Sequence, residues 1–473
     1  MNSFLLSLGI GIALVLMAAF AAPFFIDWSS YRTYFEARAS EIVGRPVRFE
    51  GELTVRLVPY PSLVAETVRI GGPGTGEGIE RIDMRAALTP LLSGELQVTE
   101  FTVVRPDVIL RVDPAGRISW ADEDEKMPPI DPDRVVLSRF EVVEGSFTVE
   151  DERSGGVYHL GEVNIEGSAS SLLGPFKVEG GGLLDGDRYT IRVATGRAAD
   201  DGSGMRFKAS ILPAARPLDI ELDGALLRIE DLPVFDGRLI IERPAPEEGA
   251  SNWRLDGQLV ASPESLVIDR MSVRLGTEAR NVSLSGAANV QLGADPRFDA
   301  VVSARQIDFD RAFGSGPDAP VSPQAAIGRI GAMLDPEIFP LPGHLALDVE
   351  SIVLAGGLLE GLSVDLETDG EIWSIERATV AAPGRASLGV AGSIGLGGET
   401  PQFDGAVRLN TDQATVFANW MFGTQARLPR FAIPAGRLEA SGQVRLDDTG
   451  MAFERVSLRS DDSEIEGSVI YRP

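Results

Sequence analysis

The sequence predicts a mostly β protein: an N-terminal transmembrane helix followed by an elongated, curved antiparallel β-sheet with a few short helices. Three observations lead to this prediction. An uncharged apolar run opens the chain, apolar and polar residues alternate with a period of two from Val47 onward, and 52 glycines and 30 prolines supply many turns. Alternation with this period is typical of half-buried strands, and the turn content exceeds the average share.

The transmembrane helix is predicted over residues 1–26. The 23 residues from Phe4 to Ile26 carry no charge, and as a helix at ~1.5 Å per residue they span about 35 Å, enough for a hydrocarbon core of ~30 Å. A cleaved signal peptide is the alternative, because Ala19 and Ala21 have cleavage spacing, but no basic residue precedes the run. The predicted anchor side chains are Phe4, Leu5, Leu14, Leu16, Phe20, Phe24 and Ile26.

A short amphipathic helix is predicted over residues 29–42, where aromatic and apolar residues recur at helical spacing before Gly44 ends the helix. In one interpretation this helix lies at the membrane surface. In the other it packs on the first strands, and the sequence leaves both open. The membrane-interface residues of the first interpretation are Trp28, Tyr31, Tyr34 and Phe35.

The strand pattern is clearest at Met271–Leu275 and Val282–Leu292, and turn clusters such as Asp447–Gly450 separate the strands. Strands joined by tight turns predict an antiparallel meander with one apolar face. The residues assigned to that face are Val55, Leu57, Ile220, Leu222, Met271, Val273, Leu275, Val282, Leu284, Val290, Leu388 and Val390.

Two predicted helices, Ser322–Phe339 and Ala414–Phe422, interrupt the strands. An acidic, proline-rich linker is predicted at 123–134 and gives the best internal boundary. The predicted division is therefore 1–26 as anchor, 27–122 as N-terminal module, 123–134 as linker and 135–473 as extended β-sheet.

Composition argues against several functional classes. Lys+Arg 43 against Asp+Glu 70 gives a net charge of −27, which disfavours nucleic-acid binding. The chain has no cysteine and only two histidines, His159 and His344, so thiolate metal sites and thiol nucleophiles are excluded and acid–base chemistry has few candidates. No phosphate-binding loop, dinucleotide fingerprint or zinc-protease motif occurs. We therefore predict no enzyme activity, no cofactor and no metal; a hydrolase using two carboxylates is the least favoured alternative.

Two stretches after the apolar run, Glu41–Gly72 and Leu88–Trp120, resemble the start of the AsmA family of envelope proteins, and Ser170–Gly180 is a further similar segment. The resemblance is specific over about residues 1–185 and only architectural afterwards. The matching elements are Gly44-Arg45-Pro46-Val47, Gly51, Pro59-x-Pro61, Leu91-Leu92-Ser93-Gly94, Arg105-Pro106 and Asp113-x-x-Gly116-x-x-x-Trp120.

This resemblance implies a single-pass anchor in the bacterial inner membrane, a periplasmic body, and a chorein-like N-terminal module over 27–122 related to bridge-like lipid-transfer proteins. It further implies transport of phospholipids toward the outer membrane along an open apolar groove, and an outer-membrane or periplasmic protein partner. Family members often continue through more strands, so a chain ending at Pro473 is either a short member or a truncated one.

An open groove agrees with the residue pattern. The candidate inner residues are mainly aliphatic, aromatics make up only 7%, and the expected helices are too few to cover a sheet of roughly twenty strands. Acyl chains at ~0.8 kcal/mol per buried methylene would cover such a face instead. The alternative function is a non-enzymatic scaffold or assembly factor for outer-membrane proteins, built on closed β-sheets.

Overall fold

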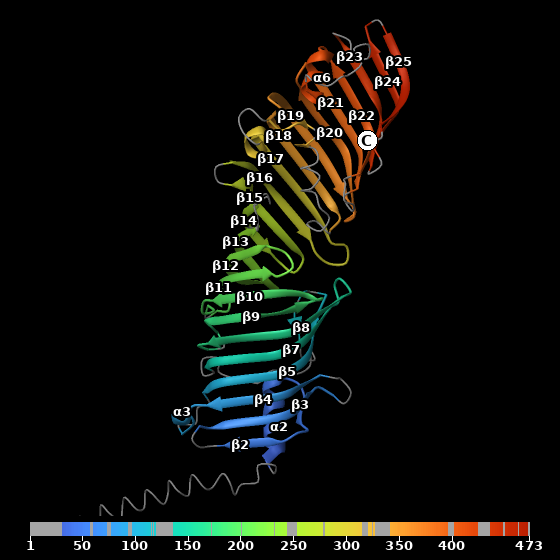
Figure 1. Cartoon of the computed structure of the whole chain (residues 1–473). Helices are drawn as coiled ribbons and strands as arrows, with labels where there is room; N and C mark the ends of the chain where they lie inside the picture. Colours follow the sequence, from blue (N-terminus) through green and yellow to red (C-terminus); the bar gives the residue numbers. More distant parts are fainter. Residues whose placement is uncertain are drawn as a thin grey trace, which may run out of the picture. The chain divides into compact units, whose positions relative to one another are not determined.

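The computed structural model describes residues 31–56, 60–72, 77–92, 97–114, 116, 118–119, 136–171, 173–199, 201–230, 232–243, 253–277, 280–314, 320–323, 325–326, 341–395, 402–423, 436–447, 450–461 and 463–471 (Figure 1). The chain divides into two compact units, Met1–Arg238 and Leu239–Pro473. The predicted boundaries next to residues 26, 122 and 134, and the whole predicted anchor, lie outside the described residues. Within the described ranges, no helix combines the length and apolar character that crossing a membrane requires.

Unit 1 is built on a β-sheet. Both β1 and β2 pair with β3, β3 to β5 continue in order, β6 forms a hairpin with β5, and β7 to β12 follow. The elements are α2 (Arg32–Val43), β1 (Val47–Phe49), β2 (Leu53–Arg56), β3 (Ser62–Ile70), β4 (Gly78–Ala86), α3 (Leu88–Leu92), β5 (Val98–Val112), β6 (Ile118–Ser119), β7 (Leu137–Asp151), β8 (Gly156–Ala169), β9 (Phe176–Leu184), β10 (Asp187–Thr195), β11 (Gly204–Pro213) and β12 (Asp219–Ile229).

Unit 2 repeats this plan, and its strands β14 to β25 pair in chain order. Strand β13 (Leu232–Arg243) contains the division between the units. The other elements are β14 (Trp253–Ala261), β15 (Ser265–Thr277), β16 (Arg280–Gln291), β17 (Arg297–Asp308), α4 (Phe309–Phe313), β18 (Gly343–Leu354), β19 (Gly357–Thr368), β20 (Ile372–Ala382), β21 (Ala386–Gly395), β22 (Gln402–Thr411), α6 (Ala414–Phe422), β23 (Leu438–Asp447), β24 (Gly450–Ser460) and β25 (Ser463–Tyr471).

The expectation of a purely antiparallel meander is wrong at two places. Strands β5 and β7 pair in parallel, as do β17 and β18, and β5 and β7 lie side by side (Figure 1). To form a parallel neighbour, the chain must return through a long connection to the end of the sheet at which the preceding strand began. Residues 113–136 and 309–342 provide these connections. The first contains the predicted linker 123–134, and the second contains the predicted helix Ser322–Phe339.

Helix α2 covers the first strands. It ends at Gly44, which adopts the left-handed conformation with φ 73° and donates its backbone N–H to the carbonyl of Ser40 at 2.9 Å. One side of α2, Phe35, Ala39 and Val43, packs on the cluster that contains Phe49. Helix α2 thus packs on the first strands, one of the two arrangements that the sequence left open. Phe35 is half-buried against this cluster, whereas Tyr31 and Tyr34 are exposed. Trp28 lies outside the described residues.

The helix also supplies hydrogen-bond partners to the outer strand β1. The backbone N–H of Phe49 donates to Oε1 of Glu36 at 2.8 Å, and that of Val47 donates to Oγ of Ser40 at 2.7 Å. An edge strand with free N–H groups is a template for unwanted strand pairing. Helix α2 thus protects this edge with its own side chains.

Of the two helices predicted from periodicity, Ala414–Phe422 is confirmed with the same bounds as α6. Most of Ser322–Phe339 lies outside the described residues. The strand predictions at Met271–Leu275 and Val282–Leu292 correspond to parts of β15 and β16, with Leu292 just beyond the end of β16.

Candidate functional site

The apolar residues of unit 1 form continuous rows along one face of the sheet. Residues directly opposite each other on paired strands point to the same face, so the strand registers trace each row across the unit. The first row is Val55, Leu63, Met84, Phe101, Phe140, Gly167, Val178, Val193, Ala209 and Leu222. The second row is Leu53, Ala65, Ile82, Val103, Val142, Ile165, Gly180, Ile191, Ile211 and Ile220.

These rows are only partly shielded from solvent. Leu53 and Ala65 are buried in the cluster that α2 covers, and Ala209 is buried. The remaining members of both rows are half-buried. A side chain inside a closed two-layer core would be fully buried, so this face of unit 1 is an open apolar surface over the strands that the structure describes.

Close backbone packing explains the two glycines in the rows. A Cβ on Gly167 would lie 2.5 Å from the ring of Phe140 in the same row, and a Cβ on Gly180 would lie 2.2 Å from the carbonyl oxygen of Asn164. The Phe140 ring therefore fills the space over Gly167, and the apolar row continues without a gap.

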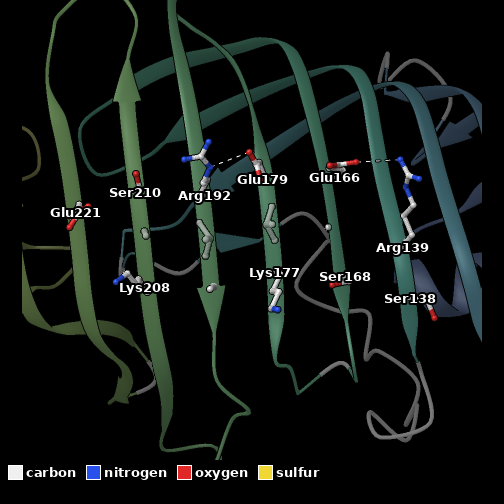
Figure 2. Close-up of a pocket in the computed structure, with 15 residues that line it drawn as sticks. Ser138, Arg139, Glu166, Ser168, Lys177, Glu179, Arg192, Lys208, Ser210 and Glu221 are labelled. Carbon is white, nitrogen blue, oxygen red and sulfur yellow. Dashed lines mark hydrogen bonds and ion pairs between the residues drawn. The ribbon is translucent and has the colours of Figure 1, made fainter.

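The opposite face of the same strands is polar. Glu141, Glu166, Glu179, Arg192, Ser210 and Glu221 are successive register partners. Nε of Arg192 lies 3.1 Å from Oε1 of Glu179, and Nη2 of Arg139 lies 3.3 Å from Oε2 of Glu166 (Figure 2). Exposed cross-strand ion pairs of this kind contribute little to stability but keep the face hydrated.

A shallow depression of about 570 Å³ is lined by residues of β7 to β12. It is lined by Lys177 and Lys208, each the register partner of Ala194, and by the Glu179–Arg192 pair (Figure 2). Lys208 also lies 3.5 Å from Oδ2 of Asp223. Acidic neighbours thus accompany the basic side chains, and the lining also includes Gly167, Val178, Val193 and Ala209 of the first apolar row.

Within each unit, the predicted groove residues that the structure describes lie on one face of the sheet. In unit 1, Val55 and Leu222 lie in the first row and Ile220 lies in the second; Leu57 is outside the described residues. In unit 2, the register joins Met271, Gly286, Val302, Leu347, Val364, Ala378, Val390 and Val407 in one row. Val273, Leu275, Val282, Leu284, Val290 and Leu388 share that face through neighbouring positions.

The apolar face of unit 2 is more enclosed than the sequence suggests. Val282 is only 5% exposed, in one cluster with Phe309 of α4, Val321 and Ala326. The sequence analysis missed α4. The signal was available: Asp308 accepts a hydrogen bond from the N–H of Arg311 as an N-cap, and Phe309, Ala312 and Phe313 have i, i+3, i+4 spacing.

A buried ion pair joins the start of β1 to β4 and β5. Nη1 of Arg45 lies 2.9 Å from Oε1 of Glu77, and the N–H of Ile109 donates to the same oxygen at 3.0 Å. Arg45 is 7% exposed and Glu77 is 4% exposed. Burial alone raises the pKa of Glu77, but the hydrogen bonds from Arg45 and Ile109 and the charges of Arg45 and Arg111 outweigh it, so this pKa lies below its ordinary value of 4.5.

The two histidines lie in different units. His159 is on β8, where Nδ1 is 3.4 Å from Oγ1 of Thr148, and His344 is on β18 between its register partners Asp299 and Glu367. Among the described residues, no group of three or more histidines and acidic residues has the arrangement of a metal site.

Comparison with known proteins adds one finding. The model of the AsmA family matches residues 1–190, the region in which the sequence motifs resemble that family. Searches of curated proteins and of solved structures found no match. The matched region includes α2, the Arg45–Glu77 pair, and the strands that carry the first seven of the ten positions of each apolar row. Residues 1–190 of this chain are therefore an AsmA family domain.

Proposed function

We propose that this protein is anchored in the bacterial inner membrane, lies mainly in the periplasm, and carries phospholipids toward the outer membrane along the apolar face of its sheet. The single observation that carries the proposal is the pair of half-buried apolar rows in unit 1, which run from β2 to β12. The AsmA domain supports a location in the cell envelope and a non-enzymatic role.

The physical basis of transport is partition between water and the apolar face. Acyl chains lying on the rows would remove apolar surface from water at ~0.8 kcal/mol per methylene, while headgroups would remain in solvent. The rows present aliphatic and aromatic side chains without any charged member. A lipid can therefore move between equivalent positions along the face without breaking a specific headgroup contact.

The test uses the full chain purified in mild detergent, with a photo-crosslinking phenylalanine analogue at Ile191. Phospholipid crosslinked to this position is measured by mass spectrometry in Val193→Asp and in Ala194→Asp. Both variants add one carboxylate to β10, but Val193 belongs to the apolar row and exposed Ala194 to the polar face.

We expect Val193→Asp to lower lipid crosslinking at least about ten-fold, because an unpaired charge against hydrocarbon costs more than the ~1.4 kcal/mol that corresponds to that factor. Ala194→Asp should remain close to the wild type. Equal effects of the two variants, or no lipid on the wild-type chain, would contradict the proposal, and a folded chain without lipid would favour the scaffold function.

A further inference from the structure

We propose that α4, together with Val321 and Ala326, is a movable cover that competes with acyl chains for the apolar face of unit 2, and that Asp310 holds it in place. This inference rests on the proposed function, because it concerns the regulation of the same apolar face. The cover is defined as Phe309–Phe313, Val321 and Ala326 throughout.

The cover lies where the chain leaves β17 to reach the parallel strand β18. Helix α4 contacts both β16 and β18, the two strands that flank β17. Phe309, Val321 and Ala326 are buried in one cluster with Val282, and Leu284 and Leu347 pack against that cluster. Val282 and Leu284 of β16 and Leu347 of β18 point to the apolar face of the sheet. The cover therefore occupies the space that an acyl chain would need in unit 2.

Asp310 joins the two parts of the cover, α4 and Val321, and fastens them to the β18–β19 turn. Its Oδ1 accepts hydrogen bonds from the N–H of Val321 at 3.0 Å and the N–H of Ala355 at 2.9 Å, and its Oδ2 accepts from the N–H of Gly356 at 2.8 Å. Ala355 and Gly356 form the β18–β19 turn with φ of 53° and 67°. Hydrogen bonds to an ionised carboxylate are stronger than those between neutral groups, so one side chain holds α4, Val321 and the turn together.

The two units differ in how far this apolar face is covered. In unit 1 the row members beyond α2, apart from Ala209, are half-buried, whereas in unit 2 Val282 is buried in one cluster with the cover. Lifting the cover would expose Phe309 and Val321, and an acyl chain on the same face would restore apolar contacts to the strands. The exchange therefore replaces one apolar surface with another, and the hydrogen bonds of Asp310 decide which one is preferred.

The test exploits the absence of cysteine from the chain. A single Val282→Cys substitution places a thiol under the cover, and its rate of reaction with a maleimide is measured in the full chain without added lipid. The rate is compared with Asp310→Asn and with Asp348→Asn as matched control. Asp348 is an exposed residue of β18 beside Leu347, on the opposite face of the sheet, and loses the same charge.

We expect Asp310→Asn to raise the labelling rate of Cys at position 282 at least about ten-fold, the factor that the loss of one charge-assisted hydrogen bond produces. Asp348→Asn should leave the rate within about two-fold. Ile220→Cys, on the uncovered face of unit 1, serves as a second reporter and should label equally in all three backgrounds. Equal labelling rates at position 282 in the two Asn variants would contradict the proposal that Asp310 holds the cover in place. Faster labelling at position 220 in Asp310→Asn would contradict it too.

A second arm measures phospholipid retained by the same variants from vesicles of phosphatidylethanolamine and phosphatidylglycerol. Retention should rise in Asp310→Asn and not in Asp348→Asn; an unchanged value would overturn competition with acyl chains. The labelling arm contains no lipid. If the cover proposal is wrong, the labelling at position 282 shows it. If the proposed function is wrong, the Val193→Asp experiment on unit 1 shows it.

Discussion

Replacing Glu77 with Gln should destabilise unit 1 by about 3–5 kcal/mol, because it leaves the buried Arg45 guanidinium without its carboxylate. The measurement is the free energy of local opening from hydrogen exchange of the β4 and β5 amides. Glu80→Gln is the matched control: Glu80 lies three positions later, on β4, but its ion pair with Arg105 is exposed on both sides. This control should change the opening free energy by less than about 1 kcal/mol.

The Glu77 effect should depend on pH in a defined direction. Because the folded-state pKa of Glu77 is lowered from its ordinary value of 4.5, its stabilisation is fully present above about pH 4.5 and is lost as pH falls through the folded-state pKa. The difference between wild type and Glu77→Gln should therefore shrink only below about pH 4.5. A difference that shrinks toward alkaline pH would refute the assignment of the effect to this carboxylate.

A double replacement separates the charge from the packing. Arg45→Met with Glu77→Leu removes both buried charges and should recover most of the stability that Glu77→Gln loses, since apolar residues of similar volume often replace a buried pair without loss. If the double variant is as unstable as the single one, the Arg45 charge that remains in Glu77→Gln is not the cause of the instability.

Trp373→Ala should destabilise unit 2 by about 3–5 kcal/mol through the cavity it leaves. Trp373 is 1% exposed and clusters with Phe298 and Leu366, and its ring centroid is 6.2 Å from that of Phe298. Ile372→Ala is the matched control, because its side chain is 47% exposed one position earlier on β20. The control should change the free energy of unfolding by about 0.5 kcal/mol or less.

Circular dichroism in urea provides the measurement for both variants, because it does not depend on the removed indole. The loss of stability caused by Trp373→Ala should appear in the unfolding transition of unit 2 alone. The amides of β4 and β5 in unit 1 should keep their wild-type hydrogen-exchange rates. Similar midpoints for Trp373→Ala and Ile372→Ala would show that the described cluster around Trp373 contributes little to the stability of unit 2.

Local pattern was enough for much of the sheet. A period of two is a property of neighbouring residues, so Met271, Val273 and Leu275 could be assigned to one face from sequence alone, and the register agrees. Gly44 as the end of α2 and Gly423 at the end of α6 follow from the same local chemistry. The AsmA resemblance likewise rested on short motifs within residues 1–190.

The sequence by itself thus determined the β class, the polarity of the two faces and the family of the first 190 residues. Only the tertiary structure decided which residues distant in sequence contact each other and hold strands, turns and helices together. Arg45 meets Glu77 across 32 positions, and Asp310 binds Gly356 across 46. The parallel pairs β5–β7 and β17–β18 likewise depend on where long connections return. Such contacts depend on register and chain path, which no local periodicity records.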